Sequence, residues 1–450
     1  MAMNNILLNC SGNAIHDAFE RIVKRQIPNK KIIGSRNYFL ENTANKVDTL
    51  NKTINESGVP ILINPLTPKY KKHIEEYIAA SVLVHNSDGW NYLSRSIDSL
   101  LNGDISSSIH LAYYAELRSV MALMAYEGIG IFNKQHIWFD SSKNHTLFRG
   151  FTTHSLVDDA MRTWANQTSK KNILFDIIKI KNVTLTDWIR ETGVLTKSTY
   201  VNTIANKWLK NWSIDLHLKE DQNLRNDMSY RPHFKESSID LKKTLEKLSE
   251  IWELLEPTSS NSFPLLDQHL LRIALFKVFK IKFGRFPQGD EYKIFVNNVF
   301  GRIGESTSQP LFEFLLRESN TIDPIIIIEA RKDRINYKVN RIDPLPIICR
   351  AILLLRLSTG AARILIDNST LNKSDLYFWC DRLCYENGIS SENPSNVDPV
   401  DLFADIRESI DEFRSNLDHI GNVRETSLSF QDSLFNLKQF QRAGIWGIMT

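Results

Sequence analysis

The chain has 450 residues, of which 42% are hydrophobic and 24% charged, a composition typical of folded globular proteins and not of disordered ones. This length favours two or three domains. The formal net charge of +3 is small for the size, so bulk electrostatics neither require nor exclude a nucleic-acid partner. The opening residues lack the basic and long apolar regions of a signal peptide, and the most apolar runs are shorter than a bilayer span. We therefore expect a cytoplasmic protein without a membrane partner.

The cysteines and the common catalytic motifs predict neither a metal site nor a cofactor. Cys380 and Cys384 are the one close pair among four scattered cysteines, and no further zinc ligands accompany their helical pattern. We interpret the four as buried or idle thiols. The phosphate-binding loop of nucleotide hydrolases and the motifs His-Glu-x-x-His and Gly-x-Ser-x-Gly are absent from the sequence.

Residues 1–70 carry the weakest pattern. A helix is expected over NAIHDAFERIVKRQI, and the prolines of GVPILINPLTP favour an extended segment. Residues 71–256 are almost wholly helical in pattern. One helix is expected to start with Ser87 or Asp88 as its N-cap and to end before Gly103, and the next covers about residues 106–127. A loop follows, and then helical patterns in THSLVDDAMRTWANQ, in TLTDWIRETG and in parts of the stretch up to Tyr230.

A last helix, with Ser238 as its expected N-cap, closes this unit, and TSSNS after Pro257 is interpreted as a linker. Residues 262–450 form the next unit. Its helical patterns are LLDQHLLRIALFKVFKI, PLPIICRAILLLRLSTGAARILI, SDLYFWCDRLCYENG and DPVDLFADIRESIDEFRSNLDHIG. The run DPIIIIEAR fits either a strand or the start of a buried helix. Short connections and the 3.6-residue period predict an all-α class for both units.

Two motifs in the first half resemble the HEPN superfamily. The first is SIHLAYYAELRSVMALMAYEGIGIF, centred on Tyr113 and Tyr114, and the second is LRNDMSYRP at residues 224–232. The pattern AYYA also occurs in ordinary helix packing, so the resemblance depends on finding both motifs in this order among the right helices. It covers about residues 77–256 and implies a HEPN-like helical bundle, followed here by a second helical domain.

In nuclease members of this family, an arginine and a histidine of the later motif meet at a dimer interface, where they act on the phosphate and the 2′-hydroxyl of RNA. The resemblance places Arg225, Asn226 and Tyr230 at the site, with the tyrosine at the position of the histidine. A phenol with a pKa near 10 is a weaker base than imidazole at neutral pH. The nearest imidazole, His233, lies beyond Pro232 and is the expected substitute base.

Glu116 is a further candidate, identified from the helical wheel. At about 100° per residue it lies about 20° from Ile109, inside the apolar stripe that includes Tyr113 and Val120. A carboxylate on a core face has to be paired or hydrogen-bonded. Two interpretations remain open: Glu116 forms a salt bridge with a neighbouring helix, or it faces Arg225 across a cleft and orients the site.

Two other arginine–histidine pairs have the spacing of the family motif. They are Arg149, next to Gly150 in a predicted loop, with His154, and Arg414 with His419 on an amphipathic helix. A chain this rich in arginine produces such pairs by chance. For the second pair a solvated helix face is the simpler interpretation, and a second, degenerate HEPN-like bundle in the C-terminal half is the other.

The leading hypothesis is a HEPN-like protein of prokaryotic anti-phage defence or stress response that cleaves RNA without a metal. RNA is then its substrate, and a homodimer or a partner defence subunit completes it. The alternative is a non-catalytic helical interaction subunit of a defence complex. Nucleotide binding in the bundle is a third function that the resemblance implies. The sequence leaves enzyme and binding module open, because the histidine of the family motif is missing.

Overall fold

The computed structural model describes residues 3–26, 68–132, 136–166, 174–193, 218–230, 239–306, 309–317, 323–332, 342–390, 398 and 400–450. Helices account for most of these residues, which confirms the predicted all-α class. The strands of this part form two small antiparallel sheets, β1–β2–β3 and β4–β5.

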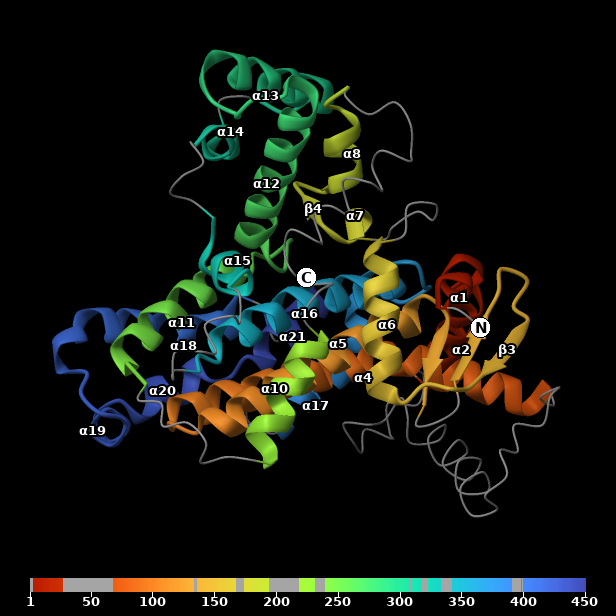
Figure 1. Ribbon diagram of the computed structural model, residues 1–450, viewed down its shortest axis with the longest axis horizontal. Coiled ribbons are helices and arrows are strands. Elements are labelled where there is room, and N and C mark those ends of the chain that lie inside the picture. Colours follow the sequence, from red (N-terminus) through yellow and green to blue (C-terminus); the bar gives the residue numbers. More distant parts are fainter. Residues whose placement is uncertain are drawn as a thin grey trace.

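The helices and strands carry the labels of Figure 1. The helices of the first half are α1 (Met3–Asn9), α2 (Asn13–Gln26), α4 (Pro68–Leu101), α5 (Ile105–Tyr126), α6 (Thr153–Asn166), α7 (Leu174–Ile177), α8 (Leu185–Arg190), α10 (Leu218–Tyr230) and α11 (Leu241–Leu255). The strands are β1 (Ile129–Ile131), β2 (His136–Phe139), β3 (His145–Phe148), β4 (Lys179–Ile180) and β5 (Val183–Thr184). The later helices are α12 (Pro264–Phe283), α13 (Gly289–Ile303), α14 (Pro310–Leu316), α15 (Ile325–Ala330), α16 (Leu345–Asp367), η4 (Lys373–Leu376), α17 (Tyr377–Glu386), α18 (Asp401–Ser415), η5 (Leu417–His419), α19 (Val423–Ser429), α20 (Gln431–Leu437) and α21 (Gln441–Met449).

The centre of the fold is the hairpin of α4 and α5. Gly103, with φ at +83°, lies just past the end of α4, and Asp104 caps α5 by accepting a hydrogen bond from the main-chain N–H of Ser107 at 3.0 Å. Helix α16 packs across both members of the hairpin, α2 and α21 pack on α4, and α10 packs on α5 (Figure 1). The hairpin therefore connects elements from the whole length of the chain.

The predicted start of a helix at Ser87 or Asp88 is wrong, because α4 runs without a break from Pro68 to Leu101. The polar stretch that suggested an N-cap instead contacts α16. The Oδ1 atom of Asn86 accepts hydrogen bonds from Ser358 at 2.7 Å and Thr359 at 2.9 Å. A Cβ atom on Gly89 would lie 2.7 Å from Leu355, so the missing side chain permits close helix packing.

Helices on both sides of the predicted boundary near residue 260 share one hydrophobic core. Trp90 of α4, fully buried, donates its indole N–H to Thr359 of α16 at 2.9 Å and lies against Gly444 of α21. Helix α16 is long and apolar enough to cross a membrane by composition, but 94% of its most apolar window is buried inside the protein. It has the character of a central core helix.

The structure also decides several smaller predictions about single helices, caps and cysteines. The run 325–330 is a helix, α15, and not a strand. Asp240, which accepts from Lys243 N–H at 3.1 Å, is the N-cap of α11 in place of the expected Ser238, which lies outside the described residues. All four cysteines are buried thiols, as predicted. The sheet β1–β2–β3 occupies the expected loop after α5, and its short strands gave no alternating pattern long enough to indicate a sheet.

Candidate functional site

Helices α5, α6 and α10 pack against one another (Figure 1). A group of aromatic and basic side chains lies where they meet. We call it the Arg225 cluster and define it as Arg225 of α10, His110, Tyr113 and Tyr114 of α5, and His154 of α6. Tyr113 is buried, and the other four side chains are partly exposed. The cluster is therefore rigid at its base and open to solvent at its edge.

Arg225 lies over the two tyrosine rings and has no acidic partner in the part of the chain that is described. Its Cζ atom is 5.2 Å from the ring centre of Tyr114 and 5.9 Å from that of Tyr113. Nη2 donates to the hydroxyl of Tyr114 at 2.5 Å, and Nη1 donates to Oδ1 of Asn226 at 2.7 Å. Nε is buried and has no hydrogen-bond partner among the described residues. The guanidinium thus contacts only neutral groups among the described residues, so its charge remains available to bind an external anion.

The two histidines of the cluster are uncharged at neutral pH. Burial, and then the positive charge of Arg225, lowers the pKa of His110 from its ordinary value of 6.5. The pKa of His154 is lowered by burial, by Arg225 and by Lys219. A neutral imidazole keeps one ring nitrogen as a proton acceptor, which is the form that a general base requires.

The two imidazoles differ in whether their hydrogen bonds leave a ring nitrogen free to accept a proton. The Tyr113 hydroxyl lies 2.7 Å from Nδ1 of His154, and burial raises the pKa of Tyr113, so the phenol keeps its proton and donates it to Nδ1. The proton of His154 is then on Nε2. Nδ1 of His110 lies 2.9 Å from Oγ of Ser229, an exposed hydroxyl that serves as donor or acceptor. With Nδ1 as the donor, Nε2 of His110 is the basic nitrogen.

Glu116 lies beside a different cation. It is 1% exposed, as the helical wheel predicted, and its Oε1 is 3.7 Å from Nε of Arg350 on α16. Asp221 of α10 accepts two hydrogen bonds from the same guanidinium, at 3.1 and 2.9 Å. This geometry corresponds to the salt bridge with a neighbouring helix. Because Asp221 precedes Arg225 by about one helical turn, the buried pair also anchors α10 next to the cluster.

The other predicted site residues are placed as follows. Asn226 contacts Arg225, whereas Tyr230, the last residue of α10, is 80% exposed. His233 lies outside the described residues. Arg414 forms an ion pair with Glu253 at 2.5 Å on an exposed helix face, the simpler of the two interpretations of its spacing from His419.

Neither His110 nor His154 was predicted from the sequence as a residue of this site. His154 was noticed only for its spacing from Arg149, but in the structure it contacts Tyr113 of α5. His110 could have been found, because it precedes Tyr114 by four residues and therefore lies on the same helix face. Their rings are indeed 5.1 Å apart.

No protein-family model matches the chain, and no curated protein or solved structure shows significant similarity to it. Within the described residues, no group of three or more His, Cys, Asp or Glu side chains is placed to hold a metal ion. The Arg225 cluster therefore offers the chemistry of its own groups, an anion-binding guanidinium beside His110, whose Nε2 can accept a proton.

Proposed function

We propose that the chain is a HEPN-like RNA-cleaving protein of prokaryotic defence or stress response, with the Arg225 cluster as its site. One observation carries the proposal. Arg225, which no carboxylate neutralises within the described residues, lies beside two histidines whose pKa is lowered. A phosphodiester needs a cation at its oxygens, and its cleavage needs a base at the 2′-hydroxyl.

The proposed reaction needs no metal. Arg225 binds the non-bridging oxygens of the phosphate, and Nε2 of His110 takes the proton from the ribose 2′-hydroxyl. The 2′-oxygen then forms a bond to phosphorus, while the bond to the 5′-oxygen breaks and that oxygen takes a proton from water. The products are a 2′,3′-cyclic phosphate and a 5′-hydroxyl. The half-buried rings of Tyr92 and Tyr114, 5.4 Å apart, give an RNA base an aromatic surface on which to stack.

The proposal is tested by incubating the purified chain with total RNA and with tRNA in a metal chelator. We expect cleavage that leaves 2′,3′-cyclic phosphate ends and falls by about a hundredfold or more in Arg225→Ala and in His110→Ala. The rate should fall as the pH is lowered through the pKa of His110, below 6.5, because a protonated imidazole cannot act as the base.

Arg414→Ala is the matched control, because Arg414 is also helical and partly exposed but pairs with Glu253 away from the cluster. It should cleave RNA at the unchanged rate. Equal cleavage by the Arg225→Ala variant, or no cleavage by the unaltered protein, would contradict the proposed activity.

The alternative of a helical interaction subunit is favoured by a separate observation. Helices α12 to α14 project from the body of the molecule (Figure 1), and this arm exposes Ile281, Phe286 and Ile294 by 47, 48 and 60%. Apolar side chains of this size on a projecting element are typical of a docking surface. Changing the three to serine should abolish co-purification of a partner subunit under this alternative, while leaving RNA cleavage intact under the first proposal.

A further inference from the structure

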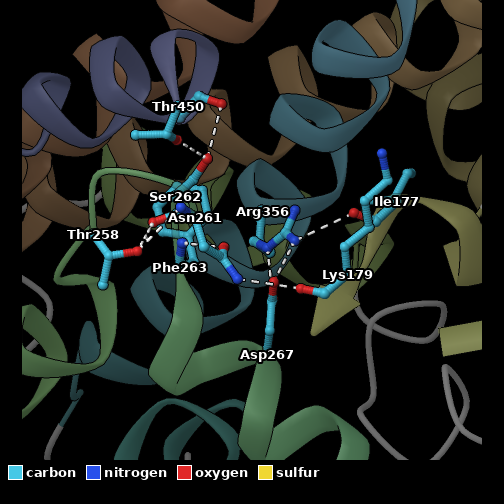
Figure 2. Close-up of polar contacts among 10 residues, drawn as sticks. Ile177, Lys179, Thr258, Asn261, Ser262, Phe263, Asp267, Arg356 and Thr450 are labelled. Carbon is cyan, nitrogen blue, oxygen red and sulfur yellow. Dashed lines mark hydrogen bonds and ion pairs between the residues drawn. The ribbon is translucent and has the colours of Figure 1, made fainter. Parts of the chain in front are cut away.

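A cavity of about 570 Å³ is lined by none of the residues of the Arg225 cluster. Its walls come from the end of α7, β4 and the turn after it, the segment before α12 and the first turn of α12, the second half of α16 and the end of α21 (Figure 2). Cavities of about 300–1,000 Å³ have the size that small organic ligands occupy. Many of the side chains that line this one are polar or basic, among them Lys179, Lys181, Arg356, Arg363 and those of the TSSNS segment.

The floor of the cavity holds a buried guanidinium. Arg356, 5% exposed, donates from Nε and Nη2 to the two carboxylate oxygens of Asp267, at 2.9 and 2.8 Å (Figure 2). Nη1 makes no hydrogen bond within the described part of the chain. It lies next to Gly360, where an added Cβ atom would approach Nη1 to 3.0 Å and Cγ2 of Ile177 to 2.0 Å. Gly360 therefore permits Ile177 to pack closely beside the guanidinium, and because Arg356 lines the cavity, Nη1 is the donor that it has left for a ligand.

Two lysines line the rim of the cavity, Lys179 in β4 and Lys181 in the turn that follows it. Lys181 and Asn182 form the two-residue turn between β4 and β5, with φ at +51° and +63°. Such turns favour Asn-Gly, and a lysine in the left-handed region is disfavoured by its Cβ atom. The turn places Lys181 and the exposed Lys179 at the cavity, where Lys181 also contacts Glu305 at 3.1 Å.

The third wall supplies neutral donors. The segment TSSNS, expected to be a simple linker, lines the cavity along its whole length, and its Ser259 and Ser260 are exposed. It leads into α12, a helix of 20 residues whose N-terminus has no side-chain cap and whose Pro264 and Gln268 also line the cavity.

The charges of the wall favour an anion over a cation. Four basic side chains line the cavity beside two acidic ones, and the acids are paired, Asp267 with Arg356 and Asp367 with Arg363 at 2.9 Å. The two lysines then give the wall its excess of positive charge, Lys181 also contacting Glu305 and Lys179 making no ion pair within the described residues. A carboxylate offers two oxygens in one plane, whereas a phosphate monoester offers three acceptor oxygens and about two negative charges.

We propose that this cavity binds a small molecule through a phosphate monoester group. Nη1 of Arg356 and Nζ of Lys179 hold the phosphate, and the hydroxyls and amides of the TSSNS segment contact the rest of the ligand. The site is separate from the Arg225 cluster, so binding is expected whether or not the chain cleaves RNA.

The test is isothermal titration calorimetry of the full chain at constant ionic strength. Ribose 5-phosphate and inorganic phosphate are the probes, ribose is the unphosphorylated control, and citrate is the carboxylate control. We expect both phosphate probes to bind and compete with each other, and Lys179→Ala to weaken them by about tenfold. Lys293→Ala removes an exposed lysine of α13 away from the cavity and should leave the affinity unchanged.

Three results would overturn the proposal. Neither phosphate probe binds at millimolar concentration; or citrate binds as well as they do; or Lys179→Ala and Lys293→Ala have the same effect. Lys179 is exposed, so its replacement is not expected to unfold the chain.

Discussion

Removing the charge of Arg350 tests the buried ion pair that anchors α10. Arg350 is 2% exposed and its guanidinium contacts Asp221, Glu116 and the main-chain oxygen of Ala330, the last at 3.1 Å. Burial disfavours its charge, but the two carboxylates outweigh burial, and the pKa of Arg350 is raised. In Arg350→Met the aliphatic volume is kept, and two buried carboxylates lose their shared cation.

Leaving a buried charge without its partner costs about 3–5 kcal/mol of unfolding free energy, and we expect a loss of this size. Urea denaturation followed by circular dichroism at pH 7 measures it. The loss should shrink as the pH falls, because a carboxylate buried without a cation has a raised pKa in the folded state and is neutralised by a proton there first.

The matched control is the triple variant Arg350→Met, Asp221→Asn, Glu116→Gln. It should recover most of the lost stability, because neutral amides cost much less to bury than carboxylates. A loss below about 1 kcal/mol in the single variant, or an equal loss in the triple variant, would refute the argument that these charges stabilise one another.

Two further predictions concern pH and packing. Burial, and then Arg118, lowers the pKa of His85 to about 3. The unfolded chain therefore takes up this proton below about pH 6.5 while the folded chain does not, and stability should fall by up to about 2 kcal/mol between pH 7 and pH 5. His85→Gln should remove that part of the pH dependence in urea denaturation, and an unchanged dependence would contradict the assignment. In Gly444→Ala, the new Cβ would lie 2.6 Å from the buried Trp90 ring, so a loss of about 1–3 kcal/mol is expected in the same assay. Gly301→Ala, with no atom within 4 Å of its new Cβ, should be neutral or stabilising, and similar losses in both variants would exclude the clash as the cause.

The helices were predictable from the sequence because most of them carry the 3.6-residue period on a face that the core covers. Helix α11 illustrates this, with Leu241, Leu245 and Leu248 all buried. The prediction was wrong where polar residues pair inside the protein. The polar stretch at Asn86 indicated a helix start, but its partners on α16 are 272 and 273 residues away in the sequence. Local pattern cannot reveal such a partner.

The candidate site was predictable to a similar degree. The sequence motif identified Arg225, and the wheel identified Glu116 as buried, but neither could tell which cation Glu116 meets. His154 reaches the cluster from α6, 41 residues from Tyr113, through the packing of α6 on α5. In our proposal, the base expected at His233, beyond the end of α10, is therefore replaced by His110 of α5, with His154 of α6 beside it.

Both sites depend on helix α16 and on its contacts with segments that are distant in the sequence, which local sequence patterns do not predict. In the sequence this helix is an apolar run broken by arginines. In the fold, Arg350 pairs with Asp221, 129 residues away, and Arg356 pairs with Asp267, 89 residues away. The first pair anchors α10 beside the Arg225 cluster, and the second forms the floor of the cavity. Because a buried arginine is tolerated only with its partner, each pair ties a distant segment to the core, and the rigid walls of both sites follow from that requirement.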